Sequence, residues 1–412
     1  MKKFKNVELA KLYRVSEKTI RNWIDAAKRQ SLNLRLISEK NKYYIADTES
    51  NHLTLKSLSD RGRKFQNRRA FTQVRPTKEF YEVYNERQII DIISNLEINR
   101  EIPHKYAYFN GGAHYFDLYI NRVIQEDNPI TVKRTIEALD FNEEYIFSLF
   151  KNNEKVNIVD IGPGNGVPVK KFAEKLIKLG KLRKYIGVDI SPEMLKIAEK
   201  NFYEWFGSLF PFEGHVRDIN IDSIQELLFK NTHISDTEEL SCINVIFYLG
   251  STIENQRKYD ESLHTIKSSM GKSDILFLGQ LLDTDKTKVH LNFSPRDKMS
   301  KNSDIELLIT VLDLLNIKQD CYEVERYYDH NEKARIISIN LKLDIDIIFE
   351  TRDFKQTVGL KTGDNIVIYR HNQHNSIEVI NSLNDIGFDL MQASLSYDGE
   401  QILVIAKIKT VS

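Results

Sequence analysis

Apolar residues along this chain occur in two patterns. Short continuous runs are typical of buried strands, and a spacing of three to four residues is typical of helices. From about residue 157 onward the two patterns alternate, with helices predicted from Val169 and over 192–201. This alternation predicts an α/β fold built on a parallel sheet. The predicted strands are 157–161, 185–189, one ending near 216–219, 244–250 and 274–282.

The C-terminal pattern differs from this alternation. Residues 377–386 read as a helix that ends at Gly387, because glycine readily adopts the left-handed conformation that terminates helices. Two apolar segments, 390–395 and 401–408, flank Asp398-Gly399 and predict an antiparallel hairpin. We therefore expect the core to comprise residues 131–283 together with 373–412.

The interval between these parts does not fit a single parallel sheet. It contains a helical pattern at 304–315 and strand patterns at 323–328, 334–343 and 365–369. We interpret residues 284–372 as an inserted α+β substrate lobe, joined by a helical part at 79–130.

The N-terminus has a helical pattern at 7–14, followed by Ser16, which is suited to cap a second helix. Two helices joined by a tight turn predict a helix-turn-helix. Segments 34–37 and 42–45 flank a turn and predict a hairpin wing, so residues 1–48 are expected to form a winged helix-turn-helix. Side chains exposed near the start of the second helix are the candidate DNA contacts: Lys18, Thr19, Arg21 and Asn22.

This stretch resembles the small winged-helix domains of MerR and excisionase proteins, which implies DNA binding. Residues 1–78 carry 20 Lys and Arg against 7 Asp and Glu, although the whole chain has a net charge of zero. Such asymmetry favours a polyanion-binding module, with DNA as the partner through residues 1–78. We expect 49–78 to be a flexible basic linker. A helical hairpin for protein contact is the alternative, and small winged-helix domains often work as homodimers.

Composition narrows the class of protein. A chain of 412 residues favours two or three domains, and no apolar run approaches the ~20 residues that span a membrane. Cys242 and Cys321 stand in unrelated contexts, which argues against a disulfide scaffold and against a cysteine-based zinc site. No metal site is predicted, and a reducing cytoplasm is the expected location.

The richest chemical signal is the glycine turn after the first core strand, 157–166. Only glycine lets a backbone turn so sharply beside a cofactor, and an acid about twenty residues later, Asp189, is placed to bind ribose hydroxyls. The turn lacks the third glycine of G-x-G-x-x-G, and no G-x-x-x-x-G-K-[ST] phosphate loop occurs. S-adenosylmethionine (SAM), which has no phosphates, is therefore favoured over NAD or ATP. An ordinary strand-to-helix bend is the alternative.

Several segments resemble the histidine-specific SAM-dependent methyltransferases, which trimethylate the α-amino group of histidine in the ergothioneine pathway. Residues 247–255, Phe-Tyr-Leu-Gly-Ser-Thr-Ile-Glu-Asn, are similar to that family's F-L-G-S-T-I-G-N. Residues 105–117 fit its K-x-F-Y-D-x-x-G-S-x-L-F-D element, and 328–337 follow its W-N-x-x-x-x-R-I-E pattern. The resemblance covers roughly 100–410 and implies a class I, Rossmann-like methyltransferase fold.

The resemblance also implies site residues. Asn255 matches the asparagine that holds the substrate carboxylate, and Tyr108 matches a tyrosine beside the amino group. A loop cap and a core aromatic are the respective alternatives. Asp218 and Ile219 would hold the adenine. The full expected cofactor set is Asp160, Gly162, Gly164, Gly166, Asp189, Asp218, Ile219 and Gly250.

Departures from the family concern the substrate. Where the family grips imidazole with a glutamate and a serine, this chain has Tyr369 and His371, and a family tyrosine falls near Asn292. A site built to hydrogen-bond one ring rejects others, so we expect a small amino-bearing substrate related to histidine but different from it. The expected catalytic residues are Tyr108, Asn255 and Tyr369. Glu254 and Asp283 are candidate carboxylates that would accept a proton.

Two function classes remain open. The first is a small-molecule N-methyltransferase with an accessory DNA- or partner-binding module. The second is a DNA-binding transcriptional regulator whose methyltransferase-like domain senses SAM or a metabolite. Methylation of DNA itself is disfavoured, because the chain has no [DN]-P-P-[YF] after the fourth strand and neither cysteine follows a proline.

Overall fold

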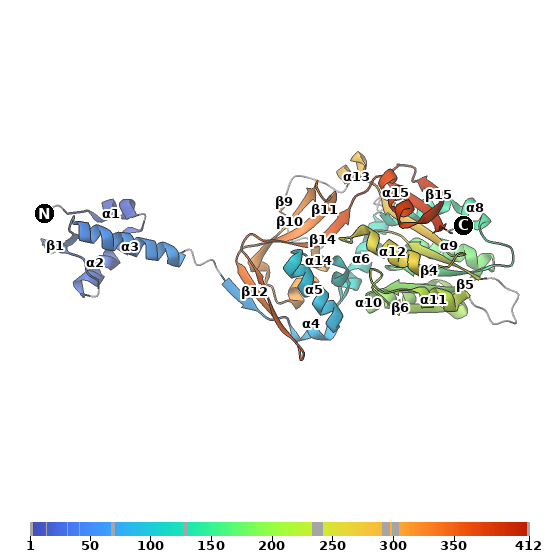
Figure 1. Cartoon of the computed structure of the whole chain (residues 1–412), viewed down its shortest axis with the longest axis horizontal. Coiled ribbons are helices and arrows are strands. Elements are labelled where there is room, and N and C mark those ends of the chain that lie inside the picture. The colour runs from blue at the N-terminus through green and yellow to red at the C-terminus, as the bar shows by residue number, and fades with distance from the viewer. Residues whose placement is uncertain are drawn as a thin grey trace. The chain divides into compact units, whose positions relative to one another are not determined.

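The computed structural model describes residues 3–13, 15–30, 32–40, 42–66, 71–126, 131–232, 242–290, 297–298 and 305–409. They divide into two compact units, Met1–Phe71 and Thr72–Ser412 (Figure 1).

The first unit is a small helical domain with a hairpin. Its elements are α1 (Asn6–Tyr13), α2 (Glu17–Lys28), β1 (Leu36–Glu39), β2 (Lys42–Ile45) and α3 (Glu49–Gln66). Ser16 caps α2 as predicted, because its hydroxyl accepts a hydrogen bond from the Thr19 backbone N–H at 3.1 Å. Leu9, Ile20 and Ile45 are fully buried and join the helices to the hairpin. The two helices and the hairpin predicted from the sequence are therefore present.

The segment 49–78, expected to be a flexible basic linker, contains regular structure. Its first part forms α3, which begins at Glu49 and packs through Leu55, 1% exposed, onto the core of the first unit. The Asn51 side chain fastens α3 to the hairpin, donating to the carbonyls of Arg35 at 2.9 Å and Ala46 at 2.8 Å. Residues 71–74 form a strand, β3, which pairs with a strand more than 270 residues later in the chain.

The second unit is built on a seven-stranded sheet. Its strands run parallel except the last strand of the chain, which pairs antiparallel with both of its neighbours and so forms the C-terminal hairpin that the sequence predicts. From edge to edge the strands are β15 (Phe388–Leu395), β16 (Gln401–Ile408), β8 (Ile275–Leu281), β7 (Cys242–Tyr248), β4 (Lys155–Ile161), β5 (Leu182–Asp189) and β6 (Phe212–Val216). The order reverses between β4 and β7, which is the switch point where ligands of such sheets bind.

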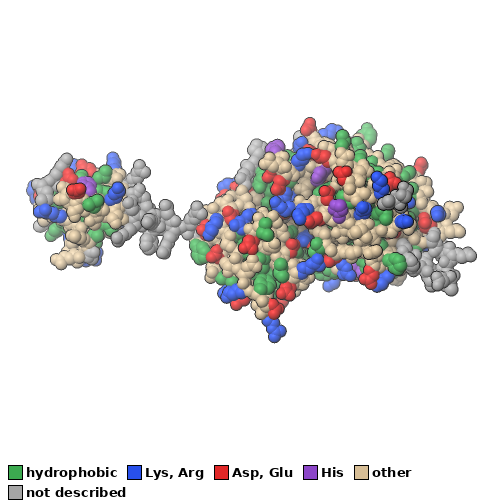
Figure 2. All heavy atoms as spheres, in the orientation of Figure 1, with side chains coloured by type: hydrophobic (Ala, Val, Ile, Leu, Met, Phe, Trp, Pro, Cys, Tyr) green, Lys and Arg blue, Asp and Glu red, His purple; other side chains and the backbone are tan. Residues whose placement is uncertain are grey.

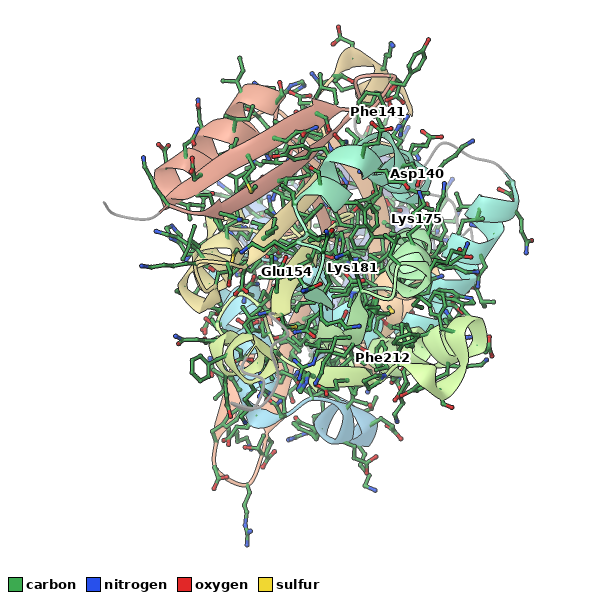
Figure 3. The ribbon with its side chains drawn as sticks, turned by 90° about the vertical axis from the view of Figure 1, so that its right-hand side faces the viewer. Asp140, Phe141, Glu154, Lys175, Lys181 and Phe212 are labelled. Atoms are coloured by element: carbon green, nitrogen blue, oxygen red, sulfur yellow. The ribbon has the colours of Figure 1, made fainter. Side chains whose placement is uncertain are left out.

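Helices cover both faces of this sheet. One face packs on α7 (Thr131–Phe141), α9 (Val167–Lys178) and α10 (Pro192–Phe206), and the other on α11 (Gln225–Thr232), α12 (Tyr259–Ser269) and α15 (Ser376–Ile386). Figure 3 looks at the edge where the parallel strands begin, with Glu154 and Lys181 just before β4 and β5, and with Asp140 of α7 near Lys175 of α9. The glycine turn and Asp189 lie at the opposite, carboxyl ends of the strands.

A second core belongs to the two stretches expected to form the substrate lobe. It contains two smaller sheets and is apolar, with Phe80, Leu312 and Ile345 fully buried. The first sheet orders β14 (Asn365–Asn372), β11 (Ala334–Leu341), β10 (Tyr322–Asp329) and β9 (Asp297–Lys298), and the second orders β13 (Lys355–Leu360), β12 (Asp344–Glu350) and β3 (Phe71–Val74). Its helices are α4 (Lys78–Val83), α5 (Glu86–Ile98), η1 (His104–Tyr108), α6 (Gly112–Gln125) and α14 (Glu306–Leu314).

The remaining elements are short connections: α8 (Glu143–Ser148), η2 (Gly207–Leu209), α13 (Asp285–His290) and η4 (Gln319–Cys321). In the part of the chain that the structure describes, no helix combines the length and apolar character needed to cross a membrane. Cys242 and Cys321 are buried free thiols. Acidic and basic side chains are interspersed over the visible face of the second unit (Figure 2).

Helix α15 offers a direct test of how local sequence stabilises the core. Asn375 caps it, accepting from the Glu378 N–H at 2.9 Å while the Glu378 carboxylate accepts from the Asn375 N–H at 2.9 Å. We expect Asn375→Ala to lower the free energy of unfolding by about 1 kcal/mol. Asn381→Ala, an exposed position in the same helix, should be neutral or slightly stabilising because alanine favours helices. Denaturant unfolding of the unmodified chain and the two variants distinguishes the effect of the cap from that of helix propensity. Equal unfolding midpoints for the unmodified chain and Asn375→Ala would show that the cap is dispensable.

Candidate active site

The glycine turn after β4 has the backbone that its sequence predicts. Gly162, Gly164 and Gly166 have φ of +65°, +57° and +79°, which side-chain-bearing residues rarely adopt. A Cβ on Gly162 would lie 2.5 Å from the Thr252 hydroxyl oxygen, and one on Gly164 would lie 3.1 Å from the Phe116 ring. Glycine is thus required both for conformation and for space.

A cavity of about 410 Å³ opens at the carboxyl ends of the core strands and extends toward η1 and α5. Seven of the residues predicted for the site line it: Tyr108, Gly162, Gly164, Asp189, Asp218, Ile219 and Asn255. The remaining predicted cofactor residues, Asp160, Gly166 and Gly250, do not line it. Gly166 is instead the N-cap of α9.

Asp189 stands at the end of β5, half-buried, with one carboxylate oxygen accepting from the Ser191 N–H at 2.8 Å. Burial raises the pKa of Asp189 to about 7, against backbone hydrogen bonds that lower it. A carboxylate in this position can accept hydrogen bonds from a pair of hydroxyl groups, and its charge is sensitive to pH near neutrality.

Asp160 has a different role in the structure from the one predicted. Its carboxylate accepts a hydrogen bond from the Tyr185 hydroxyl beneath the glycine turn, and burial raises the pKa of Asp160 to about 7. Asp160 therefore supports the turn from the core.

Asp218 follows β6 and connects the two cores of the second unit. Its carboxylate lies 2.7 Å from the Lys105 ammonium, which also lies 3.0 Å from Asp91. Lys105 belongs to η1, so this shared ion pair fixes the wall that carries Tyr108 relative to the sheet.

An aromatic group lies opposite the glycine turn. The Tyr108 hydroxyl is 3.0 Å from Nε2 of His104, and the His104 ring packs edge-on against Tyr369 with centroids 5.0 Å apart. Burial lowers the pKa of His104 to about 4, so the imidazole is neutral at pH 7. His104 was not singled out from the sequence, and the available signal was its four-residue spacing from Tyr108 on one turn.

Asn255 reaches the cavity from the loop after β7. Its side-chain oxygen is buried and has no hydrogen-bond partner among the described residues. Because buried amide groups are normally satisfied, this oxygen is available to a donor in the cavity, from a ligand or from water.

Glu254 and His371 form a buried pair beside Asn255. One Glu254 oxygen accepts from the Leu281 N–H at 2.6 Å, and the other lies 3.3 Å from Nε2 of His371. Nδ1 of His371 lies 2.6 Å from the Gln373 side-chain nitrogen. Both His371 nitrogens thus lie next to protein side chains, and His371, predicted as a substrate contact, does not line the cavity.

Asp283, the other candidate carboxylate, lies 2.9 Å from the Lys288 ammonium. Asn292, the position aligned with a family tyrosine, lies outside the described residues. Among the residues that are described, no group of three or more His, Cys, Asp or Glu side chains is arranged to hold a metal ion.

The predicted DNA contacts lie on the first unit. Lys18, Arg21 and Asn22 are exposed in the first turns of α2, whereas Thr19 is half-buried with its hydroxyl 2.9 Å from that of Ser16. Three of the four are therefore accessible, and Thr19 contributes to the cap.

Comparison with known proteins gives one strong match. Residues 85–406 match the model of a family described as histidine-specific methyltransferase, SAM-dependent. The comparison with curated proteins finds no match.

Similar solved structures are remote. They include a SAM-dependent methyltransferase from Clostridium acetobutylicum, with 10% identity over 71% of this chain and 98% of that one and a TM-score of 0.40. An amino pentose methyltransferase from Micromonospora echinaspora, solved with SAM, has 10% identity over 70% and 96% of the two chains and a TM-score of 0.36. A 1,6-didemethyltoxoflavin N1-methyltransferase from Burkholderia thailandensis has 10% identity over 75% and 91%, with a TM-score of 0.35.

Proposed function

This chain belongs to the family of histidine-specific, SAM-dependent methyltransferases, and within that family we propose that it methylates the amino group of a small molecule other than histidine. The observation that carries the proposal is the continuity of one cavity. The glycine turn, Asp189 and Asn255 line it from the carboxyl ends of the sheet strands, and Tyr108 lines it from η1.

The residues present fit SAM. The positive-φ glycines leave room for the cofactor against Thr252 and Phe116, and Asp189 offers an acceptor for ribose hydroxyls. We propose that Asp218 and Ile219 contact the adenine. Asp160, Gly166 and Gly250 act indirectly, by shaping the loops around the cavity.

Bound SAM supplies an electrophilic methyl group. The task of the chain is then to hold a neutral amine in line with it in a dry site. Burial disfavours an ammonium and so promotes loss of its proton. With its proton on Nδ1, neutral His104 accepts from the Tyr108 hydroxyl, which leaves the Tyr108 oxygen free to accept from the amine. Asn255 would fix the other end of the acceptor.

Exclusion of histidine rests on Tyr369 and His371, which stand where the family grips imidazole. Tyr369 packs against His104, and His371 is committed to Glu254 and Gln373. A ring that needs two hydrogen-bonding partners at these positions would find at most the Tyr369 hydroxyl, and its other polar atom would stay unpaired, at a substantial cost in affinity.

The proposal is tested by transfer of labelled methyl from SAM into a size-fractionated cell extract, with free amino acids including histidine in parallel. We expect label in the small-molecule fraction and none in histidine. Labelled histidine would overturn the substrate assignment, and label in nucleic acid or protein would overturn the acceptor class. Tight SAM binding without any transfer would favour the SAM-sensing regulator.

The dependence of SAM affinity on pH is a prediction specific to Asp189. Because its pKa is raised to about 7, the free protein holds this carboxyl protonated below that pH, and ribose hydroxyls bind best to the ionised form. We expect the Kd to rise about fivefold between pH 7 and pH 6 and about tenfold per pH unit below pH 6, where one full proton is displaced on binding. Calorimetry at several pH values measures this. Asp189→Asn should remove the dependence and Asp160→Asn should keep it; the reverse pattern would assign the titration to Asp160.

The first unit is proposed to bind DNA, since residues 1–78 carry a net charge of +13 and Lys18, Arg21 and Asn22 are exposed on α2. Replacing Arg21 and Asn22 with alanine should weaken DNA binding at fixed salt by about tenfold or more, because a base or phosphate contact typically contributes 1–3 kcal/mol. Exposed Lys11 on α1, replaced by alanine, is the control for loss of charge alone. Unchanged binding in a salt-controlled mobility assay would assign α2 to protein contact.

A further inference from the structure

Arg335 occupies an unusual position in the substrate lobe. It is half-buried on β11, where it is paired in register with Tyr328 of β10 on one side and His371 of β14 on the other. Side chains directly opposite each other on antiparallel strands share a face of the sheet. Tyr369, two residues before His371, lies on that face as well.

This face points toward the candidate active site. His371 contacts Glu254, the residue before Asn255, with 3.3 Å between their nitrogen and oxygen. Tyr369 packs on His104, which is hydrogen-bonded to Tyr108. Arg335 therefore shares a sheet face with Tyr369 and His371, whose contacts, His104 and Glu254, lie next to the cavity residues Tyr108 and Asn255.

The charge of Arg335 has no acidic partner among the described residues. The two other arginines near it, Arg257 and Arg370, share Glu101 and Glu332 as partners. One Glu254 oxygen accepts from a backbone N–H, and the other lies 3.3 Å from Nε2 of His371. A half-buried guanidinium without an acidic partner is available to an anion supplied by a ligand.

The hydroxyl of Tyr369 completes this group. Within the described part of the chain it makes no hydrogen bond, and Arg335 acts on it electrostatically, opposing the burial that raises the pKa of Tyr369 to about 12. Tyr369 is thus a neutral hydroxyl donor beside an available guanidinium.

We propose that Arg335 and the Tyr369 hydroxyl bind an anionic group, a carboxylate or a phosphate, at the end of the methyl acceptor distant from the methylated amine. The inference rests on the proposed function and specifies its substrate class, a small amine that carries a distal acidic group. The guanidinium would bind the anion through two parallel hydrogen bonds, which lysine cannot reproduce.

The test uses the full chain saturated with S-adenosylhomocysteine and matched probes that differ only in the acidic group. The pairs are glutamate and glutamine, O-phosphoserine and serine, and O-phosphotyrosine and tyrosine, titrated by calorimetry. We expect at least one acidic probe to bind at least tenfold more tightly than its neutral partner, as charge-assisted hydrogen bonds predict. The pair that shows the preference distinguishes carboxylate from phosphate.

Arg335→Gln should abolish this preference and Arg335→Lys should retain only part of it. Arg352→Gln, an equal loss of charge at an exposed loop position, should leave it intact. The proposal is overturned if the unmodified chain shows no preference, which includes the case that it binds no probe. It is also overturned if the preference survives Arg335→Gln. Titration of SAM into the same proteins distinguishes failure of the proposed function from failure of the anion site. If the unmodified chain does not bind SAM, the proposed function is refuted; loss of the anion preference alone does not refute it.

Discussion

Asp189→Ala is expected to reduce the affinity for SAM at least about 100-fold, since two charge-assisted hydrogen bonds to the ribose contribute roughly 1.5–3 kcal/mol each. The carboxylate lines the cavity at the end of β5, and its position is fixed by the Ser191 N–H. Alanine removes both acceptors and leaves the rest of the cavity unchanged. Calorimetric titration of SAM measures the loss directly.

The control for this variant is Asp285→Ala, which deletes a carboxylate from an exposed position of α13. We expect it to bind SAM as the unmodified chain does. Asp189→Asn should fall between the two, because an amide retains one acceptor oxygen. Near-normal affinity of Asp189→Ala, with its fold intact by circular dichroism, would remove Asp189 from the cofactor site.

Much of the core could be predicted from the sequence because its signals are local. The apolar run 157–161 followed by three glycines specifies a strand, a sharp turn and a helix within about twenty residues, and the structure has β4, the positive-φ turn and α9 in that order. Gly387 likewise ends α15 with φ of +99°. Each of these features depends on residues adjacent in the chain.

Features that depend on distant residues escaped prediction. The strand β3 exists because it pairs with β12, and Arg75 beside it contacts Glu350 at 2.5 Å across 275 positions. Strands β12 and β13 were missed for the same reason, since they stabilise each other and β3 in a small separate sheet. The sequence of helix α3 is largely polar and does not by itself predict a helix. Its contacts with the rest of the first unit, through Asn51 and Leu55, stabilise it.

In the candidate site, too, local features could be predicted from the sequence and contacts between distant residues could not. The positions of Gly162, Asp189 and Asn255 at one cavity follow from the ends of parallel strands, which meet at one edge. The contacts of each side chain, in contrast, come from separate segments of the chain. Tyr185 contacts Asp160, and Glu254, His371 and Gln373 lie next to one another. Sequence could therefore indicate which residues gather at the site but not which of them remain available to a substrate.

Asn255→Ala should lower kcat/KM for methyl transfer by about 100-fold or more while leaving the SAM Kd within about threefold. A buried amide whose oxygen has no protein partner is satisfied only when the acceptor binds, so its loss acts on the substrate. A carboxylate on the acceptor would instead accept from the Asn255 side-chain NH2 group, so Asn255→Asp, which replaces this donor with a negative charge, should also be inactive toward an acceptor that presents a carboxylate here. Labelled transfer into the small-molecule fraction measures activity, with Asn381→Ala as the control. If Asn255→Ala retained full transfer, or lost SAM binding in parallel with transfer, Asn255 would belong to the scaffold of the cofactor pocket, and the acceptor would have to be held from the side of Tyr108 alone.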